Sequence, residues 1–284
     1  MSHLPSRRFQ LRIPTRGLLP GQAEVPMRVK RLAKGLTRRA RYSGPMGRFT
    51  TDRERYVHVG IGEVGGWLAH DVVFPLGELA DAQKGLGVTG GAAEIGVHHG
   101  QLFILLALYL SEHERAVAID LFEQQGQNID GSGEGDREIL EANMTTAGVD
   151  RDRVELITAN SLDVAADAIV ASLGEPARLF SVDGGHTPEL TLNDLQLAHE
   201  TVAKGGIVIL DDAFSPMWPG VIQGLLDYLE RPECLKPFAL LGNKTLLTHE
   251  EFCKPYQDVL VPFTAHLHHR LDNVFGHPVQ ILRA

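Results

Sequence analysis

The fold of this chain is decided by Gly205-Gly206-Ile207-Val208-Ile209-Leu210-Asp211-Asp212 and by the earlier stretch Ser181-Val182-Asp183-Gly184-Gly185-His186. Each stretch is a short apolar run that ends in carboxylates. In an open α/β sheet, ligands bind outside the carboxyl ends of the strands. We therefore expect Asp183, Asp211 and Asp212 to meet His186 at one edge of a sheet. Such oxygen ligands suit a hard divalent cation such as Mg²⁺.

Outward from these stretches, apolar runs alternate with segments of helical pattern. The expected strands are 92–97, 116–121, 154–158, 179–183, 207–211 and 238–241, with late antiparallel strands at 243–248 and 274–282. The expected helices are 101–112, 136–147, 161–173, 188–203 and 221–229. Such alternation predicts an α/β fold, a Rossmann-like doubly wound and mostly parallel sheet with helices on both faces.

Charge divides the chain unevenly. Residues 1–56 hold 14 of the 27 Lys and Arg but only 3 of the 36 Asp and Glu. We expect three parts: a basic, partly irregular arm over 1–56, a helical lid or pre-domain segment over 57–89, and the α/β domain over 90–284. The arm would attract the acidic remainder, within one chain or in a homo-oligomer. Nucleic acid is a weaker alternative partner, because the arm has few aromatics and no nucleic-acid motif follows it.

The composition fits an ordinary globular protein, with 43% apolar and 22% charged residues in 284. No apolar run is long enough to predict a membrane span. Cys234 and Cys253 are isolated and lack metal-ligand spacing. So few cysteines fit a reducing compartment, and we expect a cytoplasmic location.

A glycine-containing loop follows the first expected strand. In Ala93-Glu94-Ile95-Gly96-Val97-His98-His99-Gly100, the glycines let the backbone approach a ligand at a helix N-terminus. The spacing is not the dinucleotide pattern G-x-G-x-x-G, which weakens an NAD interpretation. Asp120 ends the next apolar run, where an acid can accept hydrogen bonds from the ribose of an adenosine.

Taken in order, Glu94–Gly100, Asp120, Asp183–His186 and Gly205–Asp212 resemble class I S-adenosylmethionine-dependent methyltransferases. The similarity is greatest to the metal-dependent branch that includes macrolide-sugar O-methyltransferases and cephalosporin-hydroxylase-like proteins, and it covers roughly residues 85–250. The resemblance implies a catalytic domain over 90–284 and an O-methyltransferase acting on a small-molecule hydroxyl, on a sugar or a natural-product scaffold. Its cofactors would be S-adenosylmethionine and Mg²⁺ or another divalent cation.

The resemblance also implies residue roles. Glu94 would hold the methionine ammonium, Asp120 the ribose, and Asn160 and Ser161 the adenine. The remaining cofactor contacts would be Gly96, Gly100 and His98, the last standing where many class I members carry a glycine.

At the acceptor end, Asp183, Asp211 and Asp212 match the family's metal ligands, and Asp183 and His186 would be the catalytic pair. A metal lowers the pKa of a bound hydroxyl, and a histidine can take its proton. Because neighbouring strand residues face opposite ways, Asp211 and Asp212 can share an ion only if the strand ends or turns there. A helix-capping or packing role for His186 stays open.

Other features leave alternatives. Asp130–Asp136 with Glu141 partly fits a calcium loop, although a mobile loop near the site is favoured. Trp218 is either pocket wall or core, and His266, His268 and His269 are more typical of a surface or a strand than of a metal site. The rival functions are an NAD-linked or hydroxylase-like enzyme on the same fold, and a non-catalytic binding or assembly protein.

Overall fold

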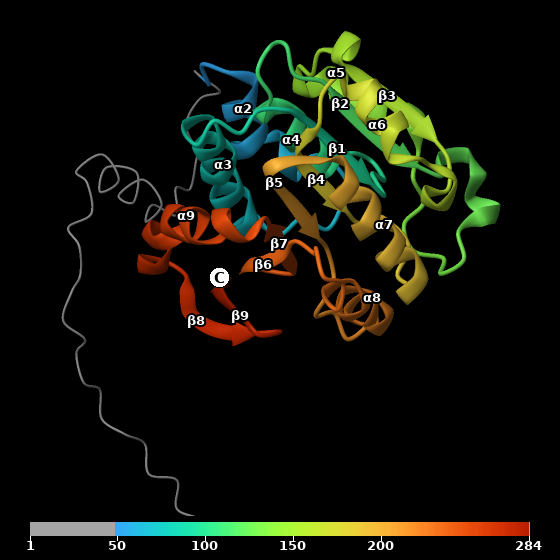
Figure 1. Cartoon of the computed structure of the whole chain (residues 1–284). Helices are drawn as coiled ribbons and strands as arrows, with labels where there is room; N and C mark the ends of the chain where they lie inside the picture. Colours follow the sequence, from blue (N-terminus) through green and yellow to red (C-terminus); the bar gives the residue numbers. More distant parts are fainter. Residues whose placement is uncertain (1–48, 284) are drawn as a thin grey trace, which may run out of the picture.

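The computed structural model describes residues 49–283, so the predicted basic arm lies outside the described residues except for its last few positions. One nine-stranded sheet organises the molecule, in the order β3-β2-β1-β4-β5-β7-β6-β9-β8. Figure 1 shows helices packed against the sheet, with β3 at one edge and the β8–β9 hairpin at the other. This arrangement confirms the predicted Rossmann-like fold with helices on both faces.

The sheet has a parallel half and a mixed half. The parallel strands are β1 Gly91–Ile95, β2 Ala116–Asp120, β3 Val154–Thr158, β4 Ala177–Val182 and β5 Val202–Leu210. β7 Lys244–Thr248 runs antiparallel to both β5 and β6 Lys236–Leu241, which confirms the predicted late antiparallel strand. The late strand expected over 274–282 is largely β9 His277–Arg283, which pairs antiparallel with β8 His268–Val274 through a short turn between them.

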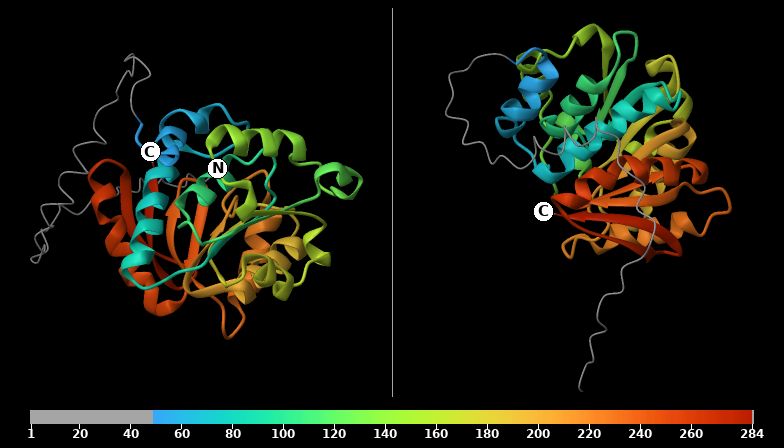
Figure 2. Two further views of the ribbon diagram at one scale, coloured as in Figure 1. Left: turned by 90° about the horizontal axis from the view of Figure 1, so that it is seen from above. Right: turned by 90° about the vertical axis from the view of Figure 1, so that its left-hand side faces the viewer.

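Alternate residues of the central strands face two separate cores, because side chains on a strand point to opposite faces in turn. On one face Ala92 and Leu179 pack with α3, α4, α5 and α9, and on the other Ala93 and Phe180 pack with α6, α7 and α8. The helices of the first face, with the preceding α2, are α2 Asp52–His58, α3 His70–Gly85, α4 Gln101–Tyr109, α5 Arg137–Ala147 and α9 Glu250–Leu260. Those of the second are α6 Ala166–Leu173, α7 Pro188–Thr201 and α8 Pro219–Leu229. Figure 2 shows this layering from two further sides.

Local chemistry explains where the helices begin. Thr187 caps α7 by accepting a hydrogen bond from Leu190 N–H, and Pro188 occupies the first turn. Asp136 caps α5 in the same way. The expected helix over 161–173 is broken, because the Asn160 side chain caps only a short 3₁₀ turn, Ser161–Asp163, before α6. None of the helices among residues 49–283 is long and apolar enough to cross a membrane.

The carboxyl ends of β1 and β4 form the point where the strand order reverses, which is where ligands bind in such sheets. The two strand ends approach very closely. A Cβ on Gly96 would lie 1.8 Å from the carbonyl oxygen of Asp183, and Gly96 has a φ of +80°. Only glycine allows this approach, so the glycine loop is pressed against the end of β4.

Candidate functional site

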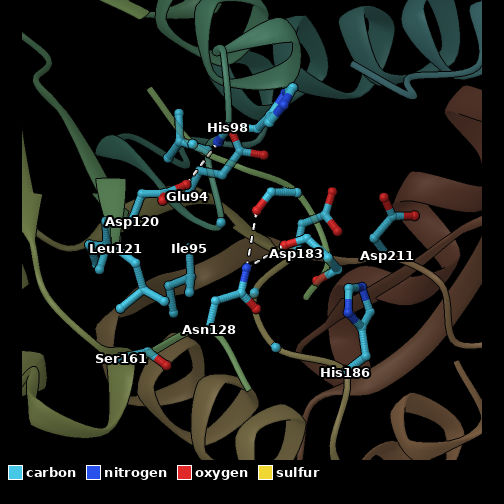
Figure 3. Close-up of a pocket in the computed structure, with 18 of the residues that line it drawn as sticks. Glu94, Ile95, His98, Asp120, Leu121, Asn128, Ser161, Asp183, His186 and Asp211 are labelled. Carbon is cyan, nitrogen blue, oxygen red and sulfur yellow. Dashed lines mark hydrogen bonds between the residues drawn. The ribbon is translucent and has the colours of Figure 1, made fainter. Parts of the chain in front are cut away.

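A cavity of about 560 Å³ opens at this reversal point. It is lined by ten of the eleven predicted site residues: Glu94, Gly96, His98, Asp120, Asn160, Ser161, Asp183, His186, Asp211 and Asp212. Figure 3 shows Asp183, His186 and Asp211 grouped on one side of the cavity, with Glu94, His98 and Asp120 further along it. The fold thus brings together residues that are more than a hundred positions apart in sequence.

Gly100 is the exception, since it does not line the cavity. It has a φ of +90° and precedes α4, and a Cβ there would lie 2.4 Å from Leu140 Cδ1. Its glycine is therefore required for the turn into α4 and its packing on α5. The prediction that it contacts a cofactor is corrected on this ground.

Glu94 is an unusual buried acid. It is 2% exposed, and its Oε1 accepts a hydrogen bond of 3.0 Å from Ser181 Oγ. Its Oε2 is buried without any hydrogen-bond partner. Burial raises the pKa of Glu94 to about 8. An unpaired buried carboxylate oxygen at a cavity wall is an acceptor prepared for a cationic or hydrogen-bonding ligand.

Asp120 is held by the glycine loop and by the start of the following turn. Its Oδ2 accepts from His98 N–H at 2.8 Å, and its Oδ1 accepts from Phe122 N–H at 2.9 Å. Each oxygen of a carboxylate can accept a second hydrogen bond. The backbone thus fixes the orientation of Asp120 while leaving it able to bind a pair of hydroxyls.

The two residues predicted to contact an adenine lie together on the cavity wall. The Asn160 side chain accepts from Leu162 N–H at 3.1 Å, and Ser161 is 7% exposed. Further around, Gln101 anchors the segment that precedes α3, because its side chain accepts from Leu68 N–H and donates to Ile61 O, each at 2.8 Å. This contact brings Trp67 to the cavity, so part of the predicted 57–89 segment forms its wall.

The acidic end of the cavity contains a cation that the sequence analysis missed. Lys244 Nζ makes a short ion pair with Asp211 and lies 3.6 Å from Asp183 Oδ2. Burial alone would lower the pKa of Lys244, but Asp183 and Asp211 raise it. Burial and the neighbouring Asp211 raise the pKa of Asp183 well above its usual range. An isolated lysine at a strand start gives no sequence signal; only the β5–β7 pairing places it here.

The chain turns at Asp211 and Asp212, which is the condition for both carboxylates to bind the same ion. β5 ends at Leu210, and Asp212 has a φ of +55°. Both oxygens of Asp211 nonetheless already have partners: Oδ1 accepts from Asp212 N–H at 2.9 Å and from Asn243 Nδ2 at 2.5 Å, and Oδ2 is paired with the Lys244 ammonium. Burial and Asp211 raise the pKa of Asp212.

His186 is oriented by a residue from the acidic glycine-rich loop. Asp130 Oδ2 accepts from His186 N–H at 2.7 Å and lies 3.0 Å from His186 Nδ1. Although burial opposes it, hydrogen bonds from Ser132 and His186 lower the pKa of Asp130 to about 2. An ionised Asp130 fixes the tautomer with the proton on Nδ1, so Nε2 is free to accept a proton. Trp218 stacks on the imidazole with ring centroids 4.1 Å apart.

These contacts settle the open alternatives. His186 lines the cavity, while Thr187 caps α7, and Trp218 both lines the cavity and packs against the core of the second face. The calcium-loop alternative is not supported, because Asp130 binds His186, Asp136 caps α5, and Glu141 pairs with Arg137 and Arg151. The three late histidines lie apart from the cavity, and His268 and His269 are exposed on the edge strand β8.

Comparison with known proteins agrees with the predicted fold and enzyme class. Residues 93–213 match the family model of a methyltransferase domain. The chain therefore contains a methyltransferase domain, and the prediction of a methyltransferase is confirmed. A search of curated proteins found no match.

Among solved structures, the O-methyltransferase NovP shares the fold, with 17% identity over 78% of this chain and 96% of that chain and a TM-score of 0.54. The calicheamicin enzyme CalS11, a TDP-rhamnose 3′-O-methyltransferase, has 19% identity over 78% and 91% of the two chains and a TM-score of 0.49. An O-methyltransferase from Bacillus cereus in complex with SAH has 19% identity over 72% and 93%, at 0.46. The last two are too distant to support an argument.

Proposed function

We propose that this methyltransferase domain uses S-adenosylmethionine to methylate a hydroxyl group of a small molecule. One observation carries the proposal: a single cavity joins the unpaired Oε2 of Glu94 to the free Nε2 of His186. The first atom is an acceptor for a cationic group, and the second is a base. A methyl transfer to a hydroxyl needs both, at two ends of one site. The shared fold with the O-methyltransferase NovP supports the same acceptor class.

The residues fit the cofactor. Glu94 Oε2 would accept from the methionine ammonium, Asp120 from the ribose hydroxyls, and Asn160 and Ser161 would lie beside the adenine. His98, whose backbone holds Asp120, would contact the cofactor from the glycine loop. When bound, S-adenosylmethionine supplies a methyl group on a positively charged sulfur.

The chain then has to orient the acceptor and remove its proton. Asp130 holds Nδ1–H of His186, so Nε2 takes the hydroxyl proton while the acceptor oxygen forms its bond to carbon. Asp212 Oδ2 lies 3.9 Å from Nε2 and stabilises the imidazolium that results. Alignment of the oxygen supplies much of the remaining rate acceleration. The site requires no covalent enzyme intermediate.

The walls favour a neutral acceptor with an apolar part. Six acids line the cavity, and its one lysine is already paired with Asp211. Trp67 and Met217 are each 74% exposed, and Ile129 is 69% exposed. Of these, Trp67 and Ile129 line the cavity. We therefore favour an uncharged sugar or natural-product scaffold over a phosphorylated one, because an anion would meet like charge.

The experiment is a calorimetric titration of S-adenosylmethionine and S-adenosylhomocysteine into the wild type, Glu94→Gln and the exposed control Glu155→Gln. We expect saturable binding to the wild type and control, and a loss of about 10- to 100-fold in Glu94→Gln, the worth of a hydrogen bond to a charged group. A panel of neutral and anionic hydroxyl compounds is then screened for methyl ethers. Absence of binding to either nucleotide would refute the proposal.

We infer a cytoplasmic location from the low cysteine content, which fits the free thiols of Cys234 and Cys253. Homo-oligomerisation through the basic arm concerns residues 1–48 above all, which lie outside the described residues. The three-carboxylate Mg²⁺ site does not fit the observed contacts of Asp211, so no step of the mechanism is assigned to a metal.

A further inference from the structure

Lys244 occupies the space between the carboxylates that were predicted to bind a metal. Its side chain is 3% exposed, it pairs closely with Asp211, and its Nζ lies 3.6 Å from Asp183 Oδ2. A buried ammonium needs such partners, since a lysine is almost never fully buried without them. The contact is therefore built into the site and is not a surface ion pair that happens to form.

The sheet fixes this lysine in place. β6 and β7 are joined by the two-residue turn Gly242-Asn243, in which Gly242 has a φ of +59°. β7 then pairs with β5 in the register Thr245↔Leu210. The residues next along these strands are Lys244 and Asp211, so the same register that closes the sheet brings the ammonium to the carboxylate.

The predicted metal ligands do not form a coordination set in this arrangement. Both oxygens of Asp211 are used by Lys244, Asn243 and the Asp212 backbone, and Asp211 is 7% exposed. Within residues 49–283 there is no group of three His, Cys, Asp or Glu side chains that could hold a metal ion. An incoming divalent ion would have to displace a buried ammonium from its carboxylate, which leaves a buried charge without its partner.

We propose that Lys244 is the permanent cation of this site and takes the place of the divalent metal that the sequence resemblance implies. This inference rests on the proposed function, because it assigns the charge balance of the same site. Lys244 holds Asp183 and Asp211 at fixed positions and cancels part of their charge. His186 and Asp212 are left facing the acceptor, and the proton leaves the hydroxyl through Nε2 without help from a bound metal.

The test is a titration of Mn²⁺ into EDTA-dialysed protein, followed by calorimetry and by the electron paramagnetic resonance of free Mn²⁺. The proteins are the wild type, Lys244→Met, Lys244→Arg and the control Lys204→Met, whose lysine side chain is 75% exposed. We expect no saturable binding to the wild type, Lys244→Arg or Lys204→Met up to about 1 mM, the weak limit of oxygen-ligand sites. Lys244→Met removes the cation from Asp183 and Asp211 and should bind Mn²⁺ at least tenfold more tightly than the wild type.

A double variant and a separate titration of S-adenosylmethionine distinguish the possible outcomes. The double variant Lys244→Met/Asp183→Asn should lose the gained Mn²⁺ binding, which would place the ion at these carboxylates. Stoichiometric binding of Mn²⁺ to the wild type with micromolar affinity would overturn the inference and support the predicted metal site. This outcome is measured on the wild type alone, so it does not depend on whether the variants fold. Titration of S-adenosylmethionine with and without EDTA is read separately. Loss of nucleotide binding in every condition counts against the proposed function, whereas Mn²⁺ binding alone decides the role of Lys244.

Discussion

The two ends of strand β4 carry buried charge of two different kinds. At its amino end, Arg178 is 0% exposed, and all five of its N–H donors have acceptors, on Glu114, Gln83, Ala80 and Tyr109. At its carboxyl end, Asp183 lies among carboxylates and a single lysine, and nearby Glu94 Oε2 and Asn243 Oδ1 have no partner. The first cluster is complete in itself. The second leaves acceptors free, which is the condition for binding a ligand.

The difference teaches how to separate structural from functional charge. Burial is similar at both ends, and both clusters contain a strong ion pair, so neither property identifies the site. The unsatisfied acceptors and the adjoining cavity identify the carboxyl end of β4 as the functional site. Variants on the two clusters should therefore affect different measurements, and the following predictions are arranged from the largest expected effect to the smallest.

Breaking the complete cluster should mainly reduce stability. Arg178→Met leaves Glu114 buried without its cation, and we expect the free energy of unfolding to fall by about 3–5 kcal/mol. That is a large part of the about 5–15 kcal/mol typical of a domain. Urea denaturation followed by circular dichroism measures the change. The double variant Arg178→Met/Glu114→Gln should lose less than the single variant; an equal or greater loss would show that the ion pair is not the cause.

Breaking the incomplete cluster should mainly reduce the rate. His186→Ala removes the proposed base, and we expect kcat to fall by about 10²- to 10⁴-fold. The free energy of unfolding should change by about 1 kcal/mol or less, because the imidazole borders a cavity. Initial rates with an acceptor found in the screen give the measurement.

A matched variant tests how the base is held. Asp130→Asn keeps the size of the side chain but cannot fix the Nδ1–H tautomer by charge, so kcat should fall by less than in His186→Ala while the affinity for S-adenosylmethionine stays near that of the wild type. A normal rate in His186→Ala would remove the histidine from the mechanism.

The buried Glu94 should make the ligand-free protein lose stability as the pH rises. Its pKa rises from 4.5 to about 8 on folding, so the folded state retains a proton that the unfolded state releases. This contribution is complete below pH 4.5 and is lost as the pH passes through about 8. Glu94→Gln cannot ionise at this position. Its melting temperature should therefore depend less on pH than that of the wild type between about pH 5 and about pH 9. Parallel profiles for the two proteins would count against the raised pKa.

An exposed ion pair should contribute least to the stability of the protein. Arg270 and Asp272 lie on the edge strand β8 with side chains 70% and 46% exposed, at an N–O distance of 3.0 Å. Arg270→Ala should change the free energy of unfolding by no more than about 0.5 kcal/mol and leave nucleotide binding unaltered. A loss as large as that of Arg178→Met would show that burial does not govern the value of these charges.

Much of the fold follows from short-range patterns in the sequence. The run at 154–158 forms the strand predicted there, and Thr187-Pro188 begins a helix as its capping chemistry indicates. One helix was missed, and one strand was expected only as an alternative for its histidines. α9 contains Pro255, which obscured its helical pattern, and β8 is an exposed edge strand with almost no apolar alternation. Both depend on neighbours for their stability, so their own sequence signals are weak.

The site was predictable where a residue follows directly from a strand end. Glu94, Asp120, Asp183 and Asp211 are placed by this rule, because parallel strands end at a common edge. Asp130 was assigned to a mobile loop, and its contact with His186, 56 positions away, was not foreseen. No local pattern encodes such a contact, since it depends on how the loop after β2 folds back over the sheet.

The sequence by itself therefore determined most of the strands, most of the helices and the set of acids at the edge of the sheet, because periodicity and strand ends are local properties. Only the tertiary structure decided the charge balance of that edge. Lys244 reaches Asp211 through antiparallel pairing of β5 with β7, and Arg178 finds its acceptors on three other segments. Coulomb interactions and hydrogen bonds depend on distance in space, and distance in space is set by the packing of elements remote in the chain.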